Sequence, residues 1–255
     1  MIPRPHSYEA LIDRWHLLAA RLKWEVVELE TSDDHPVLAL ENSTSRRENA
    51  GGLYLSAGVH GDECAAAWGL LQWAESLSET DPLLSELPIL ILPCLNPHGF
   101  VENTRLDSDG NDLNRNFQNA DLALVQSWQT LLANRKFAAA ANLHEDYDSS
   151  GIYLYELSRK ESIGHALLDA CESLIPRESS SEIDGAAMTR GLLNRSEKVE
   201  EIVEEELGGW PEAIYLFLKH ETDSFTFETP SELDLELRIS THRRFVETLV
   251  DSIRR

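Results

Sequence analysis

The strongest constraint on the fold comes from two short, largely apolar runs, Ile89–Leu92 and Ala138–Leu143. Neither run alternates apolar with polar residues along its length, which is typical of strands buried on both faces, as in a parallel sheet. Apolar side chains at helical spacing in residues 63–77 and 122–136 predict a helix before each run. Strands that alternate with helices form a sheet covered by helices on both sides. The sequence therefore predicts a three-layer α/β/α fold with a central mixed, mostly parallel sheet, made by residues 1–255 as a single domain.

The rest of the chain predicts a helix at each end and several more short strands. Residues 7–22 have helical spacing, and residues 232–255 read as a closing amphipathic helix. The segment 177–207 is polar and acidic, with three glutamates at 204–206, and is predicted to be a surface excursion near the functional site that shapes its pocket. The remaining predicted strands are residues 24–29, 37–40, 53–57, 152–155, 214–218 and 225–227.

The charge balance narrows the range of partners. The chain has 22 Lys and Arg residues against 45 Asp and Glu residues, a formal net charge of −23. Nucleic acids and anionic membranes attract basic surfaces, so neither is an expected partner.

No stretch approaches the roughly 20 apolar residues of a membrane helix, and the N-terminal residues lack the apolar run of a signal peptide. Cys64, Cys94 and Cys171 are too scattered for a disulfide framework or a thiolate zinc site. We therefore expect a cytoplasmic protein.

Three residues that can bind a metal ion follow two of the predicted strands. His60 and Glu63 come after the apolar run 53–57, and His144 directly follows Ala138–Leu143. Ligands of open α/β sheets bind at the carboxyl ends of the strands, so these side chains should meet at one edge. Zinc accepts both imidazole and carboxylate, and a catalytic zinc has three protein ligands and one open position. Each motif alone also occurs by chance, but together they predict one Zn²⁺ ion bound by His60, Glu63 and His144.

The polar loop at residues 96–117 lies between these ligands in the sequence. It contains Arg105, Asn114 and Arg115. Arginine binds a carboxylate through two parallel hydrogen bonds, which lysine cannot reproduce. Beside a metal site in an acidic protein, these side chains favour recognition of an anion. Asp112, three residues before Arg115, can orient a ligand imidazole from behind.

A further carboxylate lies at the end of a predicted strand near the C-terminus. In the run 224–230, Phe225 and Phe227 should point to one face, and Thr226 and Glu228 to the other. An ionisable residue at the end of an apolar strand needs a compensating partner. A carboxylate near a metal site can accept a proton from water and deliver it to a leaving amine. We predict this function for Glu228, although a surface strand end would also explain its position.

In their order, these motifs resemble those of the M14 zinc metallocarboxypeptidases, whose superfamily includes succinylglutamate desuccinylase and aspartoacylase. The shared motifs span residues 58–228 and are His-Gly-Asp-Glu, Asn-Pro-x-Gly, Thr-Arg, Asp-Leu-Asn-Arg-Asn-Phe, a later histidine and Phe-Thr-Phe-Glu. The resemblance implies a zinc-carboxypeptidase-like catalytic domain. It also implies the following roles: His60, Glu63 and His144 bind zinc, Asp112 hydrogen-bonds a ligand histidine, Arg105 polarises the scissile carbonyl, Asn114 and Arg115 bind the terminal carboxylate of the substrate, and Glu228 is the general base.

Three functions fit these motifs. The first is a metallocarboxypeptidase or peptide amidase that cleaves a small peptide beside a free carboxylate, as compact members similar to the murein peptide amidase do. The second is an N-acyl amino acid deacylase of the succinylglutamate desuccinylase and aspartoacylase type. The third is an inactive binding protein, but such a protein usually loses a ligand or the general base, and this chain retains all of them. His-Gly-Asp-Glu, in place of the His-Gly-Asn-Glu common in the deacylases, favours the first function.

The chain departs from digestive carboxypeptidases at one point. Those enzymes have a tyrosine over the substrate, a few residues before a Gly-Gly pair. Here the residues before Gly208 and Gly209 contain no tyrosine. Either another aromatic residue, such as Trp210 or Tyr215, closes the pocket, or the substrate is different.

Overall fold

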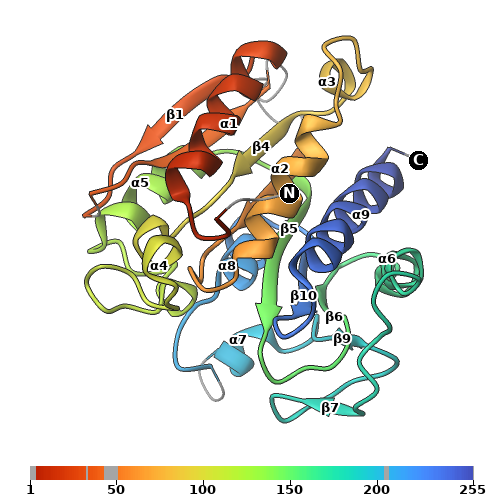
Figure 1. Cartoon of the computed structure of the whole chain (residues 1–255). Coiled ribbons are helices and arrows are strands. Elements are labelled where there is room, and N and C mark those ends of the chain that lie inside the picture. The colour runs from red at the N-terminus through yellow and green to blue at the C-terminus, as the bar shows by residue number, and fades with distance from the viewer. Residues whose placement is uncertain (1–3, 33, 43–50, 204–206, 255) are drawn as a thin grey trace.

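The computed structural model describes residues 4–32, 34–42, 51–203 and 207–254. Within them, eight strands form one sheet in the order β1-β2-β4-β3-β5-β10-β6-β9 (Figure 1). The pairs β3–β4, β3–β5, β5–β10 and β6–β9 are parallel, and β1–β2, β2–β4 and β6–β10 are antiparallel. The predicted mixed, mostly parallel sheet is therefore confirmed.

The strands are short, and most have few exposed residues. Those of the large sheet are β1 (Glu25–Leu29), β2 (Val37–Glu41), β3 (Gly52–Ala57), β4 (Ile89–Leu92), β5 (Phe137–Asp146), β6 (Tyr153–Leu157), β9 (Leu192–Asn194) and β10 (Ser224–Pro230), while β7 (Glu182–Ile183) and β8 (Ala186–Ala187) form a separate hairpin. The helices are α1 (Tyr8–Leu22), α2 (Cys64–Glu75), α3 (Leu83–Glu86), α4 (Pro97–Glu102), α5 (Ala123–Leu132), α6 (Gly164–Cys171), α7 (Val199–Ile202), α8 (Glu212–Lys219) and α9 (Leu235–Ile253), with a 3₁₀ turn, η1, at Leu113–Arg115.

Helices cover both faces of the sheet. Successive residues of a strand point to opposite faces, so each strand contacts both layers of helices. Leu53 and Leu55 of β3 pack in one apolar cluster with α1, α2 and α9, whereas Tyr54 between them packs in another with α5. Helices α2 and α9 lie against each other across the face that is turned to the viewer in Figure 1. The three-layer prediction is confirmed. No helix in the described part of the chain is long and apolar enough to cross a bilayer.

Two sequence predictions are wrong. Residues 214–218 were expected to form a strand, but they belong to helix α8, which begins after Pro211. A short, continuously apolar run fits a buried helix as well as a buried strand. The segment 177–207 is also more than a surface excursion, because its residues Leu192–Asn194 form β9, which pairs with β6 in the main sheet. The three glutamates at 204–206 lie outside the described residues.

The topology brings distant residues to one edge of the sheet. Strands β3, β5 and β10 are parallel neighbours, so the residues after Ala57, His144 on β5 and Glu228 on β10 lie near the same end. In this register Glu228 is the direct partner of His144. The turn after β3 packs tightly against α4, since a Cβ atom on Gly61 would lie 1.8 Å from the carbonyl carbon of Gly99. Only glycine allows the two backbones to approach so closely.

Candidate metal and substrate site

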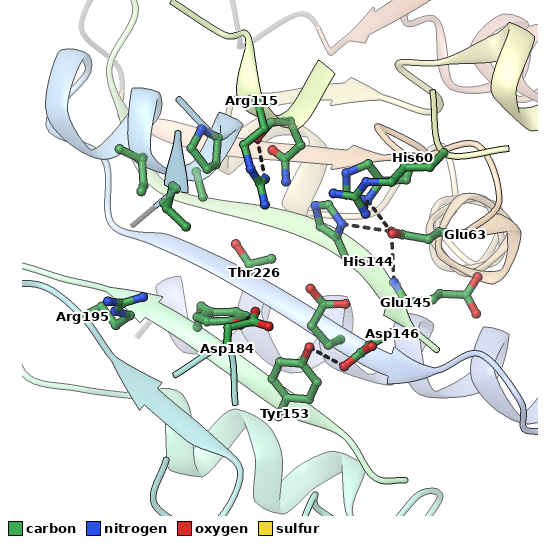
Figure 2. Close-up of a pocket in the computed structure, with 18 of the residues that line it drawn as sticks. His60, Glu63, Arg115, His144, Glu145, Asp146, Tyr153, Asp184, Arg195 and Thr226 are labelled. Carbon is green, nitrogen blue, oxygen red and sulfur yellow. Dashed lines mark hydrogen bonds and ion pairs between the residues drawn. The ribbon is translucent and has the colours of Figure 1, made fainter. Parts of the chain in front are cut away.

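His60, Glu63 and His144 form a compact buried group at this edge. His60 lies in the turn after β3, Glu63 is the residue before α2, and His144 is on β5. Their ligand atoms all lie within 4.8 Å of one another. Glu63 is between the two rings, with Oε1 2.5 Å from Nδ1 of His60 and Oε2 2.9 Å from Nδ1 of His144 (Figure 2). Two imidazoles and a carboxylate converging in this way match the donor set of a catalytic zinc site.

The electrostatics of the group favour a cation. Burial disfavours a charged imidazole, but the Glu63 carboxylate outweighs it, raising the pKa of His60 to about 9 and that of His144 above its ordinary value. Burial likewise disfavours the Glu63 carboxylate, yet the two imidazoles hold its pKa well below its usual range. A buried carboxylate therefore attracts positive charge to this point, whether protons on the rings or a metal ion between them.

Asp112 and Arg105 lie behind His60. Nε2 of His60, the ring nitrogen turned away from Glu63, is 3.4 Å from Oδ1 of Asp112. Nε and Nη2 of Arg105 donate to Oδ2 of Asp112 over 3.0 and 2.9 Å. A carboxylate on the second ring nitrogen fixes the tautomer and orientation of a metal-binding histidine. Nη1 of Arg105 is also 3.3 Å from Nδ1 of His60, so the guanidinium lies directly beside the candidate metal ligands.

Asn114 and Arg115 belong to the turn η1 and are anchored to the residues that lead into α8. The side-chain oxygen of Asn114 accepts a 3.0 Å hydrogen bond from the backbone N–H of Glu212. The carbonyl of Arg115 accepts one of 2.9 Å from the N–H of Trp210. Because the Asn114 oxygen is used in this bond, its amide nitrogen is the group that can donate to a ligand.

Glu228 completes the group from the neighbouring strand. Burial raises its pKa to about 8, and the opposing influence of His144 does not restore the ordinary value. Thr226 lies two residues earlier on the same face of β10, while Phe225 and Phe227 are in the apolar core, as the alternation predicted.

One cavity of about 430 Å³ joins these groups. All site residues predicted from the sequence line it except Asp112, which lies behind His60 and Arg105. Sequence reasoning missed the tyrosines of this cavity, Tyr147, Tyr153 and Tyr155. Tyr153 and Tyr155 share one face of β6, and the alternation of the run 153–157 was the signal that could have identified them.

The aromatic residues proposed to close the pocket are directed elsewhere. Neither Trp210 nor Tyr215 is among the described residues that line the cavity. The Trp210 ring packs against Tyr215, with centroids 6.2 Å apart, and the Lys219 ammonium lies 5.0 Å from the Trp210 ring. The tyrosines of the cavity come instead from β6 and from the loop after β5. Tyr153 donates to Asp146 over 2.8 Å and Tyr155 to Asp184 over 2.6 Å.

Comparisons with known proteins agree with this architecture. Residues 49–169 match the family model of the succinylglutamate desuccinylase/aspartoacylase catalytic domain. A candidate metallopeptidase from Shewanella denitrificans has the same fold with a TM-score of 0.83 at 20% identity, covering 97% of this chain and 91% of its own. A metallo-carboxypeptidase from Burkholderia cenocepacia aligns with a TM-score of 0.71 at 16% identity, over 97% of this chain and 69% of its own.

A metallo-carboxypeptidase from Pseudomonas aeruginosa, solved with (2-guanidinoethylmercapto)succinic acid, aligns with a TM-score of 0.70 at 15% identity, again over 97% of this chain and 69% of its own. No curated protein matches the sequence at a significant level. The catalytic-domain match and the shared fold agree with the order of motifs along the chain. These matches support the resemblance of the motifs to the superfamily that unites the metallocarboxypeptidases with succinylglutamate desuccinylase and aspartoacylase.

Proposed function

We propose that the protein is a zinc-dependent hydrolase that cleaves an amide bond next to a free carboxylate, and that residues 1–255 act as one catalytic domain. One observation carries the proposal: three candidate metal ligands, an Asn-Arg pair and a buried glutamate all line a single cavity (Figure 2). Such a site can hold a carboxylate at one end of a substrate while its amide lies beside the metal group.

The donor set of His60, Glu63 and His144 fits zinc, which accepts nitrogen and oxygen ligands and keeps a fourth position open. Zinc bound there supplies a Lewis acid that lowers the pKa of water and polarises a carbonyl. Asp112 holds the His60 ring in position through its second nitrogen.

The residues of the chain perform the remaining steps. Arg115 and the amide nitrogen of Asn114 bind the substrate carboxylate, which positions the neighbouring amide. Arg105 donates hydrogen bonds to the carbonyl oxygen as negative charge develops on it. In its ionised form, Glu228 accepts a proton from the water that attacks the carbonyl carbon. It then transfers that proton to the amine nitrogen as the C–N bond breaks, which leaves a carboxylic acid and an amine.

The leading substrate class is a small peptide with a free carboxylate, cleaved by a metallocarboxypeptidase or peptide amidase. The match of residues 49–169 to the desuccinylase/aspartoacylase catalytic domain supports a second candidate, an N-acyl amino acid deacylase. Both reactions use the same metal group, Asn-Arg pair and glutamate. We infer a cytoplasmic location, with neither nucleic acid nor membrane as partner, from the composition.

The test is mass-spectrometric detection of products after incubation of the zinc-loaded protein with a matched panel. The panel holds peptides with free C-termini, the same peptides amidated, cell-wall peptides, and N-succinyl and N-acetyl amino acids. Release of a C-terminal residue from the free-carboxylate peptides alone supports the peptidase, and cleavage of acyl amino acids alone supports the deacylase.

A matched variant tests the role of Glu228. Glu228→Gln keeps the shape of the side chain but cannot accept a proton, so it should bind one zinc ion per chain and lose at least about 10²-fold in rate. Full activity of this variant would refute the scheme, and so would a protein that binds no zinc.

A further inference from the structure

The part of the cavity beyond the candidate metal ligands has an apolar wall made from three separate elements and Leu207 between two of them. We use this name for Leu157 at the end of β6, Val199 and Ile202 of α7, Leu207, and Ala213 and Ile214 of α8. These residues form one apolar cluster with Phe217 and Val203, except for the half-buried Ile202. Because the cluster is packed from behind, the wall is formed before any ligand enters.

The apolar wall is fixed to the residues proposed to hold the substrate carboxylate. The hydrogen bond from the Glu212 N–H to the Asn114 side chain joins the first turn of α8 to the Asn-Arg pair. The bond from the Trp210 N–H to the Arg115 carbonyl joins the residues just before α8 to the same pair. A carboxylate bound by Asn114 and Arg115 therefore lies next to Ala213 and Ile214.

The charged groups at the far end of this part of the cavity favour neither a cationic nor an anionic substrate side chain. Figure 2 shows Arg195 and Asp184 on the same side of the cavity, with Thr226 between them and Arg115. Asp184 accepts the hydroxyl hydrogen of Tyr155, and the backbone N–H of Arg195 donates to the backbone carbonyl of Glu156. A cationic side chain would be attracted by Asp184 and repelled by Arg195, and an anionic one the reverse. Any charged side chain would also lose its hydration against the apolar wall.

We propose that the residue bearing the substrate carboxylate carries a large apolar side chain, such as leucine or phenylalanine, which packs against the apolar wall. This proposal rests on the proposed function, because it takes Asn114 and Arg115 as the carboxylate site. A carboxylate and a side chain on one Cα atom diverge by only a few ångströms, so binding of the first directs the second to Ala213 and Ile214. The selection applies equally to a peptide and to an N-acyl amino acid.

The test compares kcat/KM for a series of N-acyl-X and acyl-glycyl-X substrates, where X is Gly, Leu, Phe, Lys or Asp. Each additional methylene in an apolar pocket changes kcat/KM by about 10- to 200-fold, so Leu and Phe should exceed Gly by at least about 100-fold. Preference for Lys or for Asp over Leu overturns the proposal.

A charge placed in the apolar wall should change the preference. Ile202 is half-buried, and Ile202→Asp should lower kcat/KM for the Leu substrate about 10-fold or more and raise it for the Lys substrate. A gain of activity cannot result from misfolding. The control is Leu218→Asp: Leu218 packs against the same cluster but is not among the described residues that line the cavity, so the Leu-to-Lys ratio should stay unchanged. An unchanged ratio in Ile202→Asp would contradict the proposal.

Binding measured without turnover distinguishes failure of the proposed hydrolase function from failure of the proposed apolar selection. Titration calorimetry of the Glu228→Gln protein with N-acetyl-leucine and N-acetyl-lysine reports selection even when no substrate is hydrolysed. If the wild-type protein cleaves none of the substrates, tighter binding of N-acetyl-leucine by Glu228→Gln supports the apolar selection and rejects the hydrolase. Equal binding of the two ligands rejects the apolar selection, whatever the activity.

Discussion

A buried ion pair lies directly behind the metal group and joins three elements. The Glu145 side chain is fully buried, and its Oε2 accepts a hydrogen bond from Nη1 of Arg238 on α9. Its Oε1 accepts from the backbone N–H of Ala65 at the start of α2 over 2.7 Å. The backbone N–H of Glu145 donates to Oε2 of Glu63 over 3.0 Å. We therefore predict that removing the Arg238 cation, as in Arg238→Met, destabilises both the fold and the metal group.

The magnitude follows from the burial. Loss of one partner from a buried ion pair costs about 3–5 kcal/mol, because the remaining charge is left uncompensated. Burial already raises the pKa of Glu145 to about 7, although Arg238 opposes the rise. Without Arg238 the carboxyl group takes up a proton near neutral pH, which limits the cost. We expect a loss of about 3 kcal/mol at pH 7, or a Tm about 6–12 °C lower for a chain of this size.

The pH dependence has a definite sign. A carboxyl group whose pKa is raised in the folded state binds more protons when folded, so its contribution to stability falls as the pH rises above its unfolded pKa. Arg238→Met raises the folded pKa of Glu145 further. The stability difference between wild type and variant should therefore be larger at pH 8 than at pH 5. Urea unfolding at the two pH values, followed by circular dichroism, measures both differences.

A second ion pair provides the control. Arg135 donates to the buried Glu41 over 2.8 Å, and neither residue lines the described cavity. Arg135→Met should lower stability without changing zinc affinity, whereas Arg238→Met should weaken zinc binding by about 10- to 100-fold through Glu63. A loss of less than about 1 kcal/mol in Arg238→Met, or an equal loss of zinc affinity in Arg135→Met, would refute this reasoning.

Three other residues give further predictions. Asp112→Asn should weaken zinc binding by about 10- to 100-fold, because the second nitrogen of a ligand imidazole loses its carboxylate. Competition with a chelator measures this loss, and Asp109→Asn, at an exposed position, should leave zinc binding unchanged. Burial opposes ionisation of Glu178, but hydrogen bonds from nearby backbone amides lower its pKa to about 2. Its contribution to stability is thus present above about pH 4.5 and lost as the pH falls through about 2, so Glu178→Gln should lower the urea midpoint at pH 7 and have little effect near pH 2. Gly61→Ala should give insoluble or unfolded protein on expression, because the new Cβ would overlap the backbone of Gly99.

The sequence is enough to predict that the three candidate metal ligands lie close together, because their positions are set locally. His144 follows a buried strand directly, and His60 and Glu63 follow another, so identification of the two strands is enough to place all three at one edge. Glu228 is predicted for the same reason, since it lies on the face of β10 opposite the core phenylalanines. In each case a short apolar run and a titratable residue at or shortly after its end carry the information.

The helix α8 could not be predicted because tertiary contacts determine it. Its apolar run fits a strand, but Glu212 at its start is almost fully buried, and its carboxylate is hydrogen-bonded by Tyr54 and by Ser56, the latter over 2.9 Å. Both partners lie more than 150 residues away along the chain. The position of the helix thus depends on a buried polar network that no local pattern reveals.

The apolar wall cannot be predicted from the sequence either, because tertiary contacts form it. The sequence therefore indicates the chemistry of the site better than its substrate specificity. All members of the apolar wall except Leu207 come from β6, α7 and α8, and the pairing of β9 with β6 and the attachment of α8 to Asn114 help to bring them together. Apolar residues such as Val199 and Ile214 carry no motif, because the same pattern describes any packed core. The candidate metal ligands and Glu228 lie at or near strand ends and can be identified one at a time. The proposed surface for the substrate side chain exists only after three distant segments have packed.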